Sequence, residues 1–158
     1  MAQEVERKFL LSNDGWRRSA RKPVAMRQGY LGLDGPGSTR VRIEGERAFL
    51  NLKSATLGVS RLEFEYPVPL ADAQQILERL CVQPIIEKTR YHVTHARHRW
   101  EIDVFAGENT GLIVAEIELS HPDEPFARPD WLGPEVSGDP RYYNVSLVQH
   151  PYKDWGRP

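Results

Sequence analysis

The sequence predicts a mainly β, α+β fold in which eight antiparallel strands form a closed barrel with helices packed outside it. Three observations support this prediction. Apolar and polar residues alternate with a period of two in eight runs, turn-forming sequences separate the runs, and one face of nearly every run is charged. The length of 158 residues suits one domain, so residues 1–158 are expected to fold as a single unit.

The strands are expected where the alternation is clearest. They are residues 3–10, 24–33, 38–45, 47–54, 60–68, 84–95, 99–106 and 112–120. Short turns, such as the one at Gly45-Glu46 and the HARH segment at 95–98, would join neighbouring strands into an antiparallel meander.

Helices are expected where the alternation breaks off. Residues 12–21 would form a short helix, and residues 70–81 have the apolar spacing of an amphipathic helix. A third helix is expected over 140–150. The segment before it, HPDEPFARPDWLGPEVSGDP at 121–140, is rich in proline and glycine and is predicted to be irregular, with a turn or two of helix.

Composition excludes several classes of function. Lys and Arg number 21 against 22 Asp and Glu, a net charge of −1 that argues against a nucleic-acid or acidic-membrane partner. The single cysteine, Cys81, cannot form an internal disulfide or a cysteine-based zinc site, and it is expected to be a small buried residue. No apolar run approaches the ~20 residues of a membrane span, and MAQEVERK lacks the layout of a signal peptide. We therefore expect a cytoplasmic protein.

The charges gather on one face of the predicted strands. Acids lie on the first, fifth, seventh and eighth strands, and bases lie mostly on the third, fourth and sixth. The acids are Glu4, Glu6, Glu63, Glu65, Asp103, Glu116 and Glu118, and the bases are Lys8, Arg40, Arg42, Lys53, Lys88 and Arg90. A solvated face would mix polar residue types more freely. The segregation therefore favours a charged interior, with the apolar face packed under the helices.

A charged interior is costly unless it binds something. Two like charges ~4 Å apart repel by about 4 kcal/mol at an effective dielectric constant of 20, which is comparable with much of the ~5–15 kcal/mol stability of a domain. Arginine and lysine donors suit several phosphate groups, and carboxylates suit Mg²⁺ or Mn²⁺. The pattern therefore favours metal-dependent phosphoryl chemistry.

The charged motifs together resemble those of the CYTH, or triphosphate tunnel metalloenzyme, superfamily, in particular its short bacterial inorganic triphosphatase-like members. Glu4-x-Glu6-x-Lys8 resembles the ExExK signature of that family. The other motifs follow in the family's order over nearly the whole chain. They are Arg40-x-Arg42, Lys53 in LNLKS, Glu63-x-Glu65, Lys88-x-Arg90 in EKTRY, Asp103 in WEIDVF and Glu116-x-Glu118.

The resemblance implies a single tunnel domain over 1–158 that hydrolyses inorganic tripolyphosphate to pyrophosphate and phosphate. It also implies that the reaction depends on two divalent ions, Mg²⁺ or Mn²⁺. The implied metal ligands are Glu4, Glu6, Glu116 and Glu118. The implied substrate-binding bases are Lys8, Arg40, Arg42, Lys53, Lys88 and Arg90. The implied catalytic residues are Lys88 at the reacting phosphate, with Glu63, Glu65 and Asp103 at a second metal ion or the attacking water.

Two other kinds of function stay open at this point. One is a nucleoside triphosphatase or adenylyl cyclase, and the other is a non-catalytic polyphosphate- or nucleotide-binding module. Tyr91 and Trp100 fall on the face opposite the charges, so packing under a helix is favoured over stacking on a base. The expected partner is a triphosphate, without nucleic acid or membrane, and a homodimer is left open. Arg27 either joins the tunnel bases or braces an acid.

Overall fold

The computed structural model describes residues 3–33, 35–54 and 59–156. The strands are β1 (Gln3–Leu11), β2 (Arg21–Tyr30), β3 (Gly37–Glu44), β4 (Arg47–Ser54), β5 (Ser60–Val68), β6 (Ile86–His95), β7 (His98–Phe105), β8 (Ile113–Leu119) and β9 (Leu132–Glu135). The α-helices are α1 (Leu70–Arg79) and α2 (Asn144–Gln149), and the 3₁₀ helices are η1 (Gly15–Ser19), η2 (Gly107–Asn109), η3 (Pro140–Tyr142) and η4 (Tyr152–Asp154). None of the helices in these ranges is both long enough and apolar enough to cross a bilayer.

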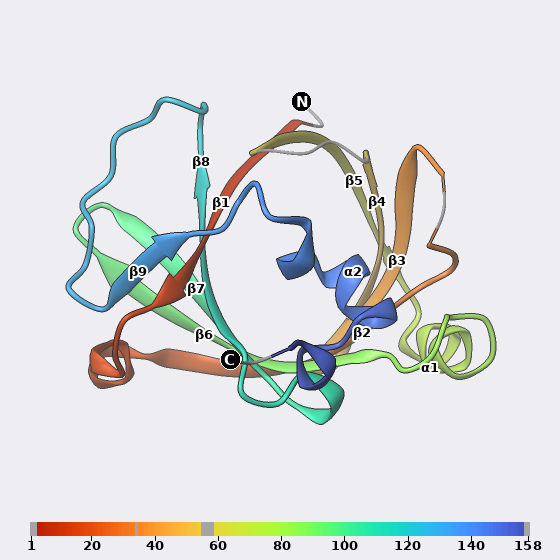
Figure 1. The fold of residues 1–158 in the computed structure, drawn as a ribbon. Helices are drawn as coiled ribbons and strands as arrows, with labels where there is room; N and C mark the ends of the chain where they lie inside the picture. Colours follow the sequence, from red (N-terminus) through yellow and green to blue (C-terminus); the bar gives the residue numbers. More distant parts are fainter. Residues whose placement is uncertain (1–2, 34, 55–58, 157–158) are drawn as a thin grey trace.

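The sheet closes on itself as predicted. Its order is β5-β4-β3-β2-β6-β7-β8-β1-β9, and β1 also pairs with β5, which closes a barrel of eight antiparallel strands. Figure 1 looks along the barrel and shows these strands surrounding a central space. The observed strands match the eight predicted ones to within a few residues. Their alternation therefore does divide the side chains into an inner and an outer set.

The seam of the barrel, where β1 pairs with β5 and closes it, is short, and a ninth strand, β9, pairs with the rest of the same edge of β1. The seam pairs only the first part of β1, from Gln3 opposite Leu62 to Val5 opposite Ser60. The end of β1 pairs with β9 instead. The prediction of irregular structure over 121–140 was therefore wrong for 132–135. Proline weakens a strand prediction, but β9 is the edge of the sheet, where a missing N–H is tolerated.

Two apolar clusters cover the outside of the barrel. Helix α1 packs over β3 and β4, where Ala73 and Leu77 meet Val41 and the buried Cys81. Figure 1 shows α1 outside the barrel, next to β3. On the opposite side, outward residues of β1, β6, β7 and β8 form a cluster around the fully buried Trp100. This burial confirms that Trp100 faces away from the charges, but the aromatic rings that contact it, Phe9, Phe126 and Trp131, lie outside the helices, so the expected packing under a helix was wrong.

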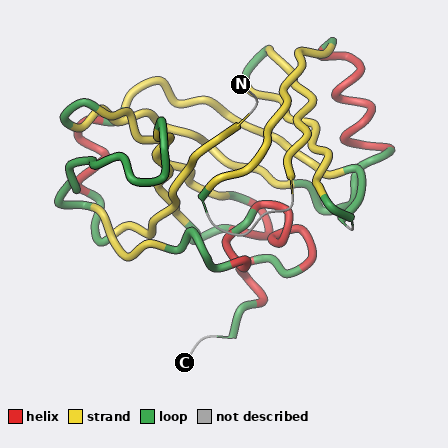
Figure 2. The backbone as a smooth tube through the Cα atoms, turned by 90° about the horizontal axis from the view of Figure 1, so that it is seen from above, coloured by secondary structure: helices red, strands yellow, loops and turns green. Residues whose placement is uncertain are grey.

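The first and third predicted helices differ from expectation. Only the 3₁₀ helix η1 forms within 12–21, and β2 already begins at Arg21. The helix expected over 140–150 is α2, preceded by η3. Instead of packing outside, α2 lies across one opening of the barrel in Figure 1, and Figure 2 shows the C-terminal helices on one side of the strands.

The apolar side of α2 packs on the inner face of the barrel. Leu147 and Val148 are buried against Ile86, Phe105 and Val114. Those three residues share the faces of their strands with inward-pointing charges two positions away, because side chains alternate along a strand. The C-terminal segment therefore closes one end of the barrel with an internal apolar cluster.

We expect Leu147→Ala to destabilise the protein by about 2–5 kcal/mol, because Leu147 has 0% exposure and its truncation leaves a cavity under α2. Leu80→Ala is the control, since Leu80 is 64% exposed and the change should stay within about 0.5 kcal/mol. Urea unfolding followed by tryptophan fluorescence measures both. Equal midpoints for the two variants would contradict the internal packing of α2.

Candidate active site

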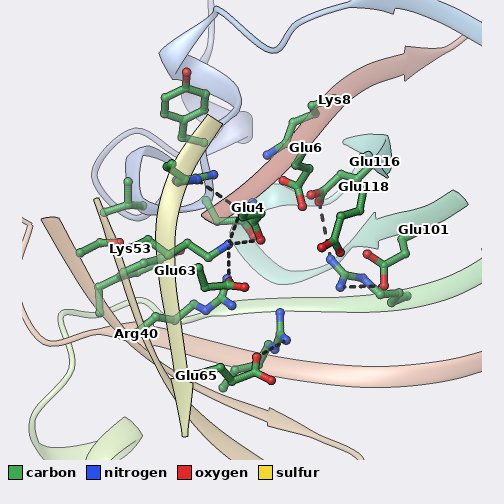
Figure 3. A pocket seen from close by; sticks show the side chains of 18 of the residues that line it. Glu4, Glu6, Lys8, Arg40, Lys53, Glu63, Glu65, Glu101, Glu116 and Glu118 are labelled. Atoms are coloured by element: carbon green, nitrogen blue, oxygen red, sulfur yellow. Dashed lines mark hydrogen bonds and ion pairs between the residues drawn. The ribbon is translucent and has the colours of Figure 1, made fainter. Parts of the chain in front are cut away.

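The barrel encloses a cavity of about 240 Å³ lined by charged side chains from most of its strands. All of the acids and bases on the predicted charged face line this cavity except Asp103. Figure 3 shows carboxylate and basic side chains directed toward one another across the space. Residues far apart in the sequence thus meet in one site, because every strand except β2 turns a charged face inward.

Two arginines on β3 differ in how far the protein satisfies them. The buried Nε of Arg40 has no hydrogen-bond partner within the described residues, whereas Arg42 Nε has no hydrogen bond there but lies 3.3 Å from Glu44 Oε2 as an ion pair. Burial lowers the pKa of Arg42, and the nearby charges of Arg40 and Arg90 lower it further. Buried donors without partners are unfavourable, so this wall of the cavity is built to receive an anion.

Asp103 lies beneath the cavity and binds two of its bases. Its carboxylate has 0% exposure and accepts hydrogen bonds from Arg90 Nε at 2.7 Å and Arg90 Nη2 at 2.9 Å. Lys88 Nζ lies 2.9 Å from Asp103 Oδ2. Burial acts to raise the pKa of Asp103, but the charges of Arg90 and Lys88 outweigh it and hold the pKa below its ordinary value. Asp103 is therefore an ionised anchor that fixes both bases.

Lys88 is the most deeply buried base of the site. Its side chain is 2% exposed, and burial lowers its pKa from 10.5 to about 8 against the opposing charge of Asp103. Besides Asp103, its ammonium donates to Asn144 Oδ1 at 3.0 Å. Asn144 is the first residue of α2, so the C-terminal segment reaches directly into the site.

A second group of charges surrounds Glu4 on the seam between β1 and β5. Lys53 Nζ lies 3.3 Å from Glu4 Oε1 and 3.1 Å from Glu63 Oε2, and Arg61 Nε lies 3.4 Å from Glu4 Oε1. Burial raises the pKa of Glu4, partly offset by Lys53. Glu65 accepts a hydrogen bond from Asn51 Nδ2 at 2.8 Å. These acids are thus each held by a neighbouring donor.

The remaining acids lie together on β1, β7 and β8. Glu6 is opposite Glu118 in the register of β1 and β8, and Glu101 is opposite Glu116 in that of β7 and β8. Burial raises the pKa of Glu118, and the charges of Glu101 and Glu63 add to the effect. Within the described ranges, no ion pair forms at Glu6 or Glu118. This wall is an excess of negative charge that a cation would relieve.

The donor chemistry of this acidic wall suits a hard divalent ion. Carboxylate oxygens are the ligands preferred by Mg²⁺ and Mn²⁺, and Glu6 and Glu118 are not committed to ion pairs in the described part of the chain. As the side chains stand, the described residues include no group of three or more metal-ligating side chains close enough to hold an ion. The chemistry therefore fits a metal ion, whereas a ready-made cage is not formed.

The structure adds residues that the sequence analysis did not select. Arg61 and Glu101 line the cavity, and both lie two positions from a selected acid, so strand alternation could have found them. Asn144 lines the cavity as well, and no charge pattern marked it. Arg27 is exposed and does not line the cavity, which places it outside the set of tunnel bases.

A closed antiparallel barrel with a basic wall, an acidic wall and an internal cavity defines a class of proteins that bind phosphate chains inside a barrel. The family model of the CYTH domain matches residues 2–152, and the chain belongs to the CYTH domain family. An inorganic triphosphatase of Acetivibrio thermocellus is 47% identical over 155 residues, which cover 98% of this chain and 99% of that protein.

Two further relatives agree with this placement. An inorganic triphosphatase of Nitrosomonas europaea is 35% identical over 151 residues, covering 92% of this chain and 96% of that protein. The crystal structure of an inorganic triphosphatase superposes with a TM-score of 0.66 at 32% identity, covering 94% of this chain and 95% of that one. The resemblance drawn from the charged motifs is thereby confirmed at the level of the family.

The buried Lys88 should make stability depend on pH. Its pKa is about 8 in the folded protein and 10.5 ordinarily, so between these values the unfolded chain binds more protons and the free energy of unfolding rises with pH. Relative to Lys88→Met, the wild type should gain up to about 3 kcal/mol between about pH 7 and about pH 10.5. Urea unfolding across this range measures it. Lys22→Met, at an exposed lysine, is the control and should show the wild-type pH dependence.

Proposed function

We propose that this protein hydrolyses inorganic tripolyphosphate to pyrophosphate and orthophosphate inside the barrel, with residues 1–158 forming one catalytic domain. The observation that carries the proposal is the buried Nε donor of Arg40, which has no partner among the described residues, in a cavity lined by further bases that include the ion-paired Arg42. The Arg40 donor has no structural use in the free protein. A chain of phosphate groups satisfies it together with donors of the other bases.

The bases divide between holding the substrate and acting at the reacting phosphate. Lys8, Lys53, Arg40 and Arg42 hold the chain of phosphates by charge-assisted hydrogen bonds. Lys88 and Arg90, fixed by Asp103, stabilise the charge that grows on the reacting phosphate as water forms a new P–O bond and the bridging P–O bond breaks. We place Asp103 as a positioning residue instead of at a second metal ion or the attacking water, where the sequence suggested it, because it pairs with the two bases and does not line the cavity.

The acids supply the second half of the chemistry. Glu4, Glu6, Glu116 and Glu118 would hold two divalent ions, Mg²⁺ or Mn²⁺, with Glu63 and Glu65 as neighbouring carboxylates that orient the attacking water. When bound, such ions neutralise phosphate charge and lower the pKa of water. The support in this chain is the excess of carboxylates on one wall, two of which have no ion pair among the described residues.

Turnover should depend fully on a divalent ion, because the acidic wall otherwise repels the substrate. We expect a chelator to abolish phosphate release. Glu118→Gln keeps the shape of the side chain but removes its charge, and kcat should fall about 10²-fold or more. Glu78→Gln, on the exposed face of α1, is the matched control and should keep wild-type kcat. Near-full activity of Glu118→Gln at saturating Mg²⁺ would remove Glu118 from the site.

The enzyme should discriminate between substrates by the number of their phosphate groups. Pyrophosphate leaves part of the basic wall unfilled, and each lost charged contact is worth ~1.5–3 kcal/mol, so its kcat/KM should be at least about 10²-fold below that of tripolyphosphate. Nucleoside triphosphates should rank between the two, because Trp100 is packed on the outer face and offers no stacking surface inside. Phosphate release from the three substrates tests this order. A kcat/KM for ATP above that for tripolyphosphate would favour a nucleotide enzyme instead.

A further inference from the structure

We propose that Asn144, at the start of α2, is a positioning residue that holds the Lys88 ammonium in its working place. The inference deepens the proposed function and rests on it for its kinetic consequences. Its starting point is the hydrogen bond from Lys88 Nζ to Asn144 Oδ1 at 3.0 Å. The partners are 56 residues apart in the sequence, since Lys88 lies on β6 and Asn144 follows the last strand by nine residues.

The ammonium of Lys88 is held between two acceptors. An ammonium has three N–H donors and no acceptor. Asp103 Oδ2, 2.9 Å away on β7, takes one donor and Asn144 Oδ1 takes another. Lys88 lines the cavity, so its third donor is available to a phosphate oxygen. Two fixed acceptors from different elements define the direction of the third N–H, which one acceptor alone would leave free to rotate.

The orientation of the Asn144 amide is itself fixed. Gln28 is fully buried on β2, and its Nε2 donates to the same Asn144 oxygen at 2.8 Å. If the Asn144 amide turned over, its NH₂ group would face both the NH₂ of Gln28 and the ammonium of Lys88. Three donors would then meet with no acceptor between them. The Lys88 ammonium, which can only donate, therefore selects the amide orientation in which the Asn144 oxygen faces it, and Gln28 Nε2 adds a second donor to that oxygen.

The same segment also holds a second cavity lysine. Lys8 Nζ donates to the carbonyl oxygen of Tyr142 at 3.1 Å, two residues before Asn144. The segment is anchored in turn by the buried packing of Leu147 and Val148. The C-terminal segment is thus a scaffold for the site rather than only a cover, and Asn144 is the side chain through which it acts on Lys88.

The kinetic test is a double-mutant cycle between Asn144 and Lys88. With tripolyphosphate and Mg²⁺, Asn144→Ala should lower kcat about tenfold or more while KM changes less than about threefold, because the lost contact acts at the reacting phosphate. In a Lys88→Ala background, Asn144→Ala should have no further effect on kcat. Gln149→Ala, at the exposed end of α2, is the matched control and should leave kcat unchanged. Independent, multiplying effects of the two substitutions would overturn the proposal.

A second measurement follows Lys88 without relying on activity. In ¹H–¹⁵N spectra of the lysine ammonium groups, Lys88 is identified as the signal lost in Lys88→Arg. That signal should shift or broaden in Asn144→Ala and stay in place in Gln149→Ala. Asn144→Leu, which nearly preserves the side-chain volume, replaces the alanine variant if that one fails to fold. An unchanged Lys88 signal in the Asn144 variants overturns the positioning role. If the signal shifts in these variants but the wild type releases no phosphate from tripolyphosphate, only the proposed function is overturned.

Discussion

The constraint on which this molecule depends is the burial of ionised side chains inside a closed barrel. Closure turns one face of every strand inward, and here that face carries charges on every strand of the barrel except β2. Unpaired charges there would oppose folding, so the most deeply buried charges are paired with opposite ones on neighbouring strands. Asp103 illustrates the solution, since it has no exposure and is met by both Arg90 and Lys88. The order of acidic and basic strands is therefore a condition for folding as well as for binding.

The same backbone that completes the barrel also completes the site. Where β1 leaves β5, its edge is taken over by the C-terminal segment: Val136 N donates to Lys8 O at 2.8 Å, and Lys8 N donates to Ser137 Oγ at 2.8 Å. This pairing carries the chain from the outside of the barrel to its opening. From there α2 enters the apolar end of the interior and brings Asn144 to Lys88. The same C-terminal segment thus both pairs with the edge of β1 and brings a side chain to the site.

Strand alternation was enough to predict the barrel and most of the cavity lining, because in a closed sheet the side-chain period alone assigns each residue to a face. It could not predict β9, whose Gly133 and Pro134 argue against a strand unless its edge position is known. Nor could it place α2, because the apolar Leu147 and Val148 suit either face of the sheet. Asn144 could not be selected from the sequence, because an uncharged residue gains its role only from that placement.

The bases of the cavity fall into two kinds, and this division explains how a stable barrel can still bind an anion strongly. Lys88, Arg90 and Lys53 have acidic partners in the free protein, so their positions are set before substrate arrives. Arg40 keeps a buried Nε donor without a partner among the described residues, and the buried Nε of Arg42 has an ion pair with Glu44 at 3.3 Å but no hydrogen bond, so both arginines can still gain hydrogen bonds from a phosphate. If every base were paired, an incoming phosphate would have to break as many contacts as it makes. If none were paired, mutual repulsion would oppose closure of the barrel. The bases with acidic partners are therefore held in place to position the reacting phosphate, and the β3 arginines provide the donors that favour substrate binding.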